Sequence, residues 1–136
     1  MARWLIDGTN VFGSRPDGWW NNRPRAADSL TRTVAEWCRG HDDEVLVVFD
    51  QPVDDATVAQ SGGNLRVVVA ERRGRDAADD VIVGHVDSWQ GDGGTAPPPS
   101  APSRLVVVSS DKGLRARLPS WVELRSVGSF RRLIGY

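Results

Sequence analysis

Four short runs of apolar, largely β-branched residues constrain the fold of this chain more than any other feature. Each run is continuous rather than alternating between apolar and polar residues, which is typical of parallel strands buried on both faces. WVELRSV, at 121–127, predicts a weaker fifth strand. The four runs are RWLI before Asp7, EVLVVF before Asp50, LRVVVA at 65–70 and RLVVVSS before Asp111.

Segments with a helical spacing of apolar residues separate these strands. They cover 28–40, 76–90, a stretch near 111–118 and the closing SFRRLIGY. Strands that alternate with helices predict an α/β fold, a three-layer α/β/α sandwich with a mostly parallel central sheet of four to five strands. We expect residues 1–136 to form a single domain. The Gly- and Pro-rich segment 91–103 is expected to be a flexible loop, because too little chain follows it to fold alone.

Composition says more about where in the cell the protein is found than about its function. The formal net charge of −1 excludes a uniformly basic nucleic-acid arm but leaves room for a local basic face. A single cysteine, Cys38, fits a reducing compartment. The sequence has no run of about 18 apolar residues and no stretch like a signal peptide ahead of the first strand. We therefore expect a cytoplasmic protein with no membrane partner.

Acidic residues stand where three of the predicted strands end, at Asp7, Asp50 and Asp111. Because parallel strands end at the same edge of a sheet, these carboxylates are expected to converge. Asp79 joins them from the first turn of the helix that Asp76 is expected to cap. Carboxylates brought together repel one another unless a cation lies among them, and an oxygen-only donor set suits Mg²⁺ or Mn²⁺.

Each acid also has a simpler interpretation. Aspartate is common after strands because it favours turns and helix N-caps, so any one of these residues alone indicates a turn. Asp54 and Asp55 indicate a solvated helix start, and Asp80 points about 100° around the helix from Asp79. The metal interpretation therefore depends on all four acids meeting at one edge.

Four motifs in this order, LIDGTNV, VVFDQP, DAADDVIV and VVVSSDKGL, resemble the NYN domain branch of the PIN-like metal-dependent ribonucleases, close to the YacP-like proteins. The resemblance covers nearly the whole chain and implies a PIN-like fold and a hydrolase that acts as an endoribonuclease on single-stranded RNA. Ala77 departs from the Thr or Ser that the family has before the Ala-Asp of the helix motif. The resemblance implies a metal cluster of Asp7, Asp50, Asp79 and Asp111, a catalytic role for these acids and for Asn10, and supporting positions for Asp80, Ser109 and Ser110.

RNA would also require groups that bind phosphates and bases. Arginines near the metal edge would pair with phosphates without reading sequence, and a loop tryptophan would stack on a base. ERRGR lies in the loop that leads into the Asp79 helix, and SRPDGWWNNRPR follows the first motif. The candidates for RNA binding are Arg72, Arg73, Arg75, Arg15, Arg115 and Trp19.

The same motifs bear on other functions. A haloacid-dehalogenase-like phosphatase would need an aspartate where Leu5 stands, and neither a Gly-x-Gly-x-x-Gly motif nor a P-loop follows the first strand. The alternatives that the sequence leaves open are a non-catalytic RNA-binding or adaptor module and a toxin-like nuclease controlled by a protein partner. A homodimer, a regulatory partner and a DNA substrate also stay open.

Overall fold

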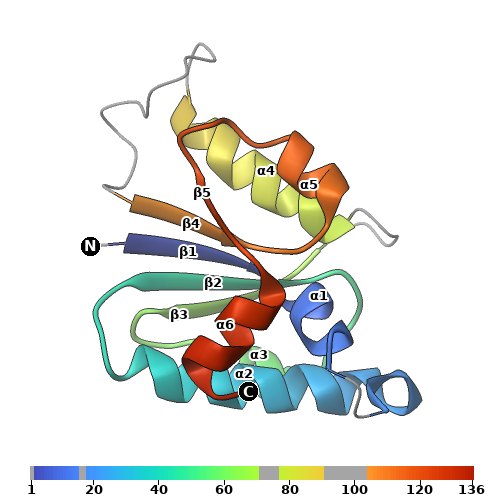
Figure 1. The fold of residues 1–136 in the computed structure, drawn as a ribbon. Helices are drawn as coiled ribbons and strands as arrows, with labels where there is room; N and C mark the ends of the chain where they lie inside the picture. Colours follow the sequence, from blue (N-terminus) through green and yellow to red (C-terminus); the bar gives the residue numbers. More distant parts are fainter. Residues whose placement is uncertain (1, 16–17, 71–76, 91–103) are drawn as a thin grey trace.

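Five parallel strands form the centre of the molecule. The structure is a computed structural model that describes residues 2–15, 18–70, 77–90 and 104–136 (Figure 1). The strands lie in the order β3-β2-β1-β4-β5, and every neighbouring pair is parallel. The predicted loop at 91–103 and the predicted phosphate-binding arginines at 72, 73 and 75 lie outside the described residues. The bounds are Ala2–Asp7 for β1, Glu44–Phe49 for β2, Leu65–Val69 for β3, Arg104–Val108 for β4 and Glu123–Arg125 for β5.

Helices occupy the segments between the strands, with one 3₁₀ turn, η1. The second helix begins five residues earlier than the predicted 28–40, because the Asn22 side chain accepts a hydrogen bond from the Arg25 N–H (3.2 Å) and caps it. The short first helix was not predicted; its N-cap is Asp7. The bounds are Gly8–Gly13 for α1, Trp19–Asn21 for η1, Arg23–Cys38 for α2, Asp55–Val58 for α3, Ala77–Gln90 for α4, Lys112–Ala116 for α5 and Val127–Ile134 for α6.

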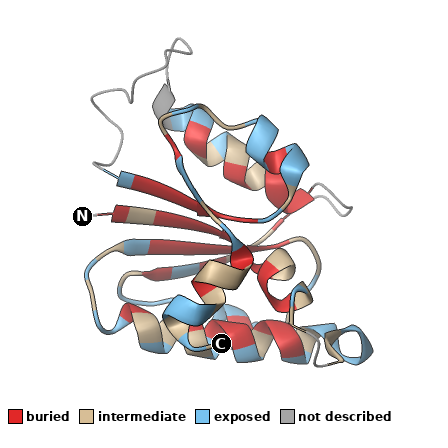
Figure 2. Cartoon of the chain, in the orientation of Figure 1, coloured by how far each residue is buried: buried red, intermediate tan, exposed pale blue. Residues whose placement is uncertain are grey.

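Two hydrophobic cores lie on opposite faces of the sheet, so the predicted three-layer sandwich is confirmed (Figures 1 and 2). On one face, Ile6 of β1 packs with Leu30 of α2 and Phe130 of α6. On the other face, Leu5 packs with Ile82 of α4. Neighbouring residues of β1 thus enter different cores, as the alternation of side chains along a strand requires. Buried strands need apolar residues on both faces, which explains the continuous apolar runs.

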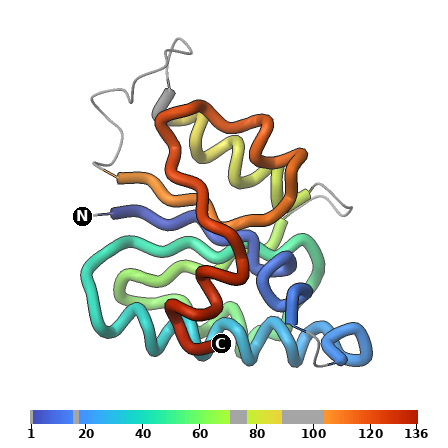
Figure 3. The backbone as a smooth tube through the Cα atoms, viewed as in Figure 1, coloured from blue at the N-terminus to red at the C-terminus, as the bar shows by residue number. Residues whose placement is uncertain are grey.

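The chain changes layers in the part that follows β4. Figure 3 shows the C-terminal segment leaving α5, forming β5 at the sheet edge and entering α6 beside α2. The strand order reverses between β1 and β4, which are neighbours in the sheet although they are far apart in sequence. In open α/β sheets, ligands bind outside the carboxyl ends of the strands at such a switch point. No helix within the described ranges is long and apolar enough to span a bilayer.

Candidate metal and nucleic-acid site

A cleft of about 440 Å³ lies at the carboxyl edge of the sheet, around the switch point. The four predicted aspartates reach it from β1, the end of β2, the first turn of α4 and the end of β4. The structure therefore brings these sequence-distant acids to one place, as the strand ends predicted. The lining residues are Asp7, Thr9, Asn10, Gly13, Ser14, Trp19, Asp50, Ala78, Asp79, Ser110, Asp111 and Val127.

Asp7 is the most buried acid of the cleft together with Asp79, each with 5% of its surface exposed. One carboxylate oxygen of Asp7 accepts the Asn10 backbone N–H (3.3 Å), and the other accepts the Ser109 hydroxyl (3.4 Å). The pKa of Asp7 is raised to about 7, mainly by burial and to a smaller extent by the carboxylates of Asp79 and Asp50. The hydrogen bonds from Asn10 and Ser109 act in the opposite direction and lower this pKa. A cation beside Asp7 would favour its ionised form.

Asp50 is held by a residue of the first motif that the sequence analysis did not select. The Thr9 hydroxyl donates to Asp50 Oδ1 (2.9 Å) and accepts the Asp50 backbone N–H (3.2 Å). This pair of bonds joins the start of α1 to the end of β2 and fixes the Asp50 carboxylate at the cleft. The sequence feature that could have identified Thr9 as a site residue is its hydroxyl, because it stands in LIDGTNV between Asp7 and Asn10, two predicted site residues.

A glycine allows α1 to begin directly beside β2. A Cβ on Gly8 would lie 2.6 Å from Cε1 of Phe49 and 2.9 Å from Cγ1 of Val47. Both of these side chains are fully buried. Only a residue without a side chain at position 8 therefore lets the start of α1 lie so close to the end of β2.

Backbone and side-chain bonds also fix the loop after β4. The Ser110 N–H donates to Asn10 Oδ1 (3.0 Å), so the Asn10 side chain joins α1 to the loop after β4. The Asp111 N–H donates to the Ser109 hydroxyl (3.1 Å). Asp111 also caps α5, because its Oδ1 accepts the N–H groups of Gly113 (2.7 Å) and Leu114 (3.3 Å). Ser109 is buried behind Asp7, whereas Ser110 is exposed and lines the cleft.

The neighbouring acid on α4 has a different position. Asp80 forms an ion pair with Arg117, just after α5 (2.9 Å), and is not among the residues that line the cleft. This agrees with the rotation of about 100° expected from Asp79, but it places the Asp80 carboxylate between α4 and α5. Asp80 therefore helps to fix α4 to the α5 segment instead of supporting the cleft acids directly.

Of the described candidates for RNA binding, only Trp19 lines the cleft. Its ring packs on Phe12 with centroids 5.7 Å apart, and the Arg23 guanidinium lies 5.4 Å from its centroid. Trp20 packs edge-on against Trp19 and is 59% exposed. Arg15 instead lies over the Tyr136 ring at 4.4 Å, and Arg115 is exposed on α5; neither is among the cleft residues.

The donor chemistry of the cleft fits Mg²⁺ or Mn²⁺, because its acidic groups offer only oxygen. Within the described ranges, no three His, Cys, Asp or Glu side chains are grouped closely enough to hold a metal ion by themselves. Mg²⁺ commonly keeps several waters and binds through one or two carboxylates. Asp7, Asp79 and Asp50 line the same cleft, and the carboxylates of Asp79 and Asp50 raise the pKa of Asp7.

Solved structures share this fold. The crystal structure of Rae1 (YacP) from Bacillus subtilis, as its W164L mutant, superposes with a TM-score of 0.71 at 20% identity, over 99% of this chain and 76% of that one. The structure without that mutation gives 0.70 and 19% identity over 99% and 74% of the two chains. The T5 D15 protein, co-crystallized with metal ions, gives 0.53 and 13% identity over 93% and 54%. No protein-family model and no curated protein matches the chain.

The fold is therefore shared with Rae1 (YacP), and the resemblance to YacP-like proteins is confirmed at the level of the fold. The parallel sheet with helices on both faces is the arrangement that the motifs implied.

Proposed function

We propose that this chain is a Mg²⁺- or Mn²⁺-dependent endoribonuclease that hydrolyses phosphodiester bonds in single-stranded RNA. The observation that carries the proposal is the meeting of Asp7, Asp50, Asp79 and Asp111 at one cleft on the carboxyl edge of the sheet. The PIN-like fold, shared with Rae1 and with a T5 protein crystallised with metal ions, supports it.

Asp7 and Asp79 are the best candidates to hold the metal, because they are the two buried acids of the cleft. Asp50 and Asp111 line the same cleft and are more exposed, so they are suited to metal-bound water or to a second ion. A bound divalent ion would lower the pKa of a coordinated water and stabilise charge on the phosphate oxygens.

The protein's own contribution is to fix these acids before substrate arrives. Ser109 orients Asp7, and Thr9 orients Asp50, each through a hydroxyl donor. Carboxylates held in this way lose less freedom when they bind a cation, and hydrogen bonds to metal ligands commonly affect affinity by about 10–100-fold. The hydrogen bond between Asn10 and Ser110 holds α1 to the loop after β4, and both residues line the cleft.

The tryptophans beside the cleft support a single-stranded substrate. Trp19 lines the cleft and Trp20 exposes more than half of its surface next to it. An unpaired base can stack on an exposed indole, whereas a base inside a duplex already stacks on its neighbours. Arg23 lies against Trp19 and is near enough to contribute charge to the same rim.

The deciding experiment is cleavage of end-labelled RNA with Mn²⁺ or Mg²⁺, with EDTA, and with the Asp7→Asn and Asp79→Asn proteins. We expect cleavage only by the wild-type chain with metal present. Asp42→Asn is the matched control, because Asp42 is exposed at the other end of the sheet. Cleavage that persists in EDTA and in both cleft variants would disprove the mechanism. RNA binding without any metal-dependent cleavage would favour the adaptor module.

A further inference from the structure

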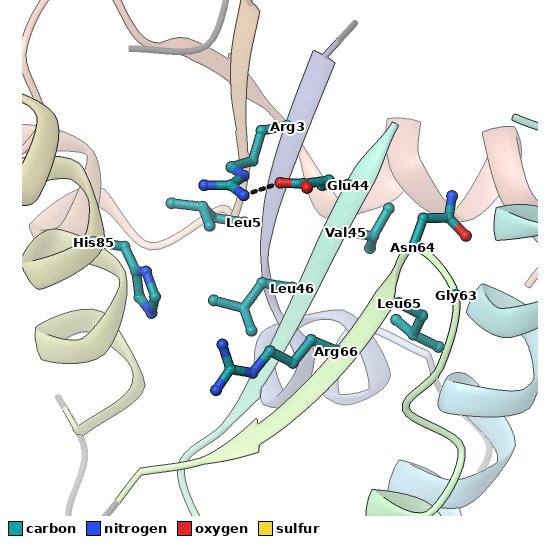
Figure 4. Close-up of a pocket in the computed structure, with 10 residues that line it drawn as sticks. All are labelled: Arg3, Leu5, Glu44, Val45, Leu46, Gly63, Asn64, Leu65, Arg66 and His85. Atoms are coloured by element: carbon teal, nitrogen blue, oxygen red, sulfur yellow. Dashed lines mark ion pairs between the residues drawn. The ribbon is translucent and has the colours of Figure 1, made fainter. Parts of the chain in front are cut away.

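A second hollow lies near the amino ends of the strands. Part of it lies on the face that α4 covers, and Val45 and Leu65 of the opposite core also line it. Its volume is about 270 Å³, and it opens between α4 and strands β1, β2 and β3 (Figure 4). The residues that matter below are Arg3 and Leu5 of β1, Leu46 of β2, Arg66 of β3 and His85 of α4. They come from four elements, and none of them lines the cleft of the four aspartates.

The register of the sheet brings these side chains together. Arg3 and Leu5 lie on the same side of β1, and Leu5 and Leu46 pair across the β1–β2 ladder. Leu46 in turn pairs with Arg66 on the edge strand β3. Asp7 is four residues beyond Arg3 on the same strand face, which at about 3.3 Å per residue is roughly 13 Å away. The hollow and the cleft are therefore separate sites at opposite ends of the strands.

The ionisable side chains of this hollow are mostly basic. Arg3, Arg66 and His85 line it together with one carboxylate, Glu44, which forms an ion pair with Arg3. Arg66 is exposed and has no ion pair with any described residue. Burial lowers the pKa of His85, and the positive charges of Arg3 and Arg66 lower it further, so these three groups act on one another. An anion placed among them would relieve this repulsion.

We propose that this hollow binds the phosphate group of a nucleotide. Arg66 supplies the planar guanidinium fork that matches phosphate oxygens, and Arg3 and His85 supply further nitrogen donors. Leu5 and Leu46 form an apolar floor for the sugar or base. The volume of about 270 Å³ is slightly below the range of about 300–1,000 Å³ typical of pockets for drug-sized ligands, so it suits the phosphate group with part of its nucleoside.

The phosphate could come from two sources, a free mononucleotide or one nucleotide of an RNA strand. The free nucleotide needs no nuclease activity, whereas the strand source rests on the function proposed above. Binding of AMP is therefore measured calorimetrically in EDTA, where the metal-dependent reaction cannot contribute. Binding of a single-stranded RNA is measured in the Asp7→Asn background at several salt concentrations.

Arg66→Gln is the test variant, and Arg39→Gln is its control because Arg39 is exposed at the end of α2 and undergoes the same change in charge. Arg66 is exposed, so the fold should tolerate its replacement, which a melting curve checks. For a free nucleotide, we expect Arg66→Gln to weaken AMP binding at least tenfold and Arg66→Glu to abolish it. For a strand phosphate, we expect the salt slope of RNA binding to fall by about 0.7 for the lost contact.

Either difference between Arg66→Gln and Arg39→Gln supports the site and identifies the source of the phosphate. Two results together would overturn the phosphate site. In the first, Arg66→Gln and Arg39→Gln bind AMP equally well, or no protein binds AMP. In the second, both variants have the same salt slope for RNA binding. A chain that cleaves no RNA but loses AMP binding on Arg66→Gln would refute the nuclease and retain this site. The two proposals therefore fail on different results.

Discussion

The Ser109 hydroxyl donates a hydrogen bond to the Asp7 carboxylate (3.4 Å) across a separation of 102 residues. The bond joins the ends of β1 and β4, the two strands that flank the switch point of the sheet. Because the same hydroxyl accepts the Asp111 N–H (3.1 Å), one buried serine sets the positions of two cleft acids. The candidate site is thus part of the folded core and does not depend on a single flexible loop.

The titration of Asp7 should make the metal-free protein less stable as pH rises. The pKa of Asp7 is about 7 in the folded chain and 3.8 in a model peptide, so between these values the folded state keeps a proton that the unfolded state has lost. The contribution of Asp7 to stability is therefore largest below about pH 4, falls through this window and levels off above pH 7. The full difference corresponds to roughly 4 kcal/mol, an upper bound for the measured change.

Asp7→Asn should remove this slope and raise the free energy of unfolding in EDTA at pH 8 by about 1–4 kcal/mol. Asparagine can still cap α1, so the fold should persist. Urea titrations at pH 5 and pH 8 measure both effects, with Asp42→Asn as the control. A variant with the same pH dependence as the wild type would show that Asp7 does not carry the shift.

Thr9→Val should raise the metal concentration that cleavage requires, without unfolding the protein. The change removes the hydroxyl that donates to Asp50 and accepts its N–H, which should cost about 1 kcal/mol of stability. The Mn²⁺ concentration for half-maximal cleavage should rise about 10–100-fold, since Asp50 loses its orienting donor. Thr9→Ser keeps the hydroxyl and should restore the wild-type value; failure to do so would exclude this role.

Gly8→Ala should destabilise the chain, because its Cβ would lie 2.6 Å from the buried ring of Phe49. Overpacking of this kind costs about 1–3 kcal/mol. Gly84→Ala is the matched control, since nothing lies within 4 Å of a Cβ there and the position is inside α4. That change should stabilise the chain by about 0.5–1 kcal/mol. Chemical denaturation measures the free energy of unfolding of both variants. Changes of the same sign would contradict the close approach of Gly8 to Phe49.

Trp20→Ala should weaken binding of single-stranded RNA by about 1–3 kcal/mol if the indole stacks on one base. Its effect on the melting temperature should be small, because 59% of the residue is exposed. Leu133→Ala, also exposed and on α6, serves as the control for loss of apolar surface. Fluorescence anisotropy in the Asp7→Asn background measures the affinity. An unchanged dissociation constant would remove Trp20 from the RNA path.

The strands and the meeting of the acids could be predicted from the sequence because burial on both faces demands continuous apolar runs. In a parallel sheet, all strands have their carboxyl ends at the same edge, so residues that follow the strands lie near one another. Helix geometry likewise separated Asp79 from Asp80 before any contact was known. These inferences need only local pattern and one topological rule.

The contacts within the site required the folded chain. Thr9 acts on a residue 41 positions away, and no local pattern of GTNVFG indicates that partner. The first helix escaped prediction because six residues with two glycines show no usable periodicity, and its N-cap is an acid already assigned to metal. The position of the Arg66 guanidinium at the hollow depends on strand register, and the pairing of β2 with β3 defines that register.

The position of β1 has a consequence for the lifetime of the site. Its backbone is hydrogen-bonded to β2 on one side and β4 on the other, and both of its faces are packed. Amide protons of such a strand exchange with solvent only when the molecule opens extensively. The segment that carries Asp7 should therefore be among the last to take up deuterium, and the acid should keep its place until the whole chain unfolds.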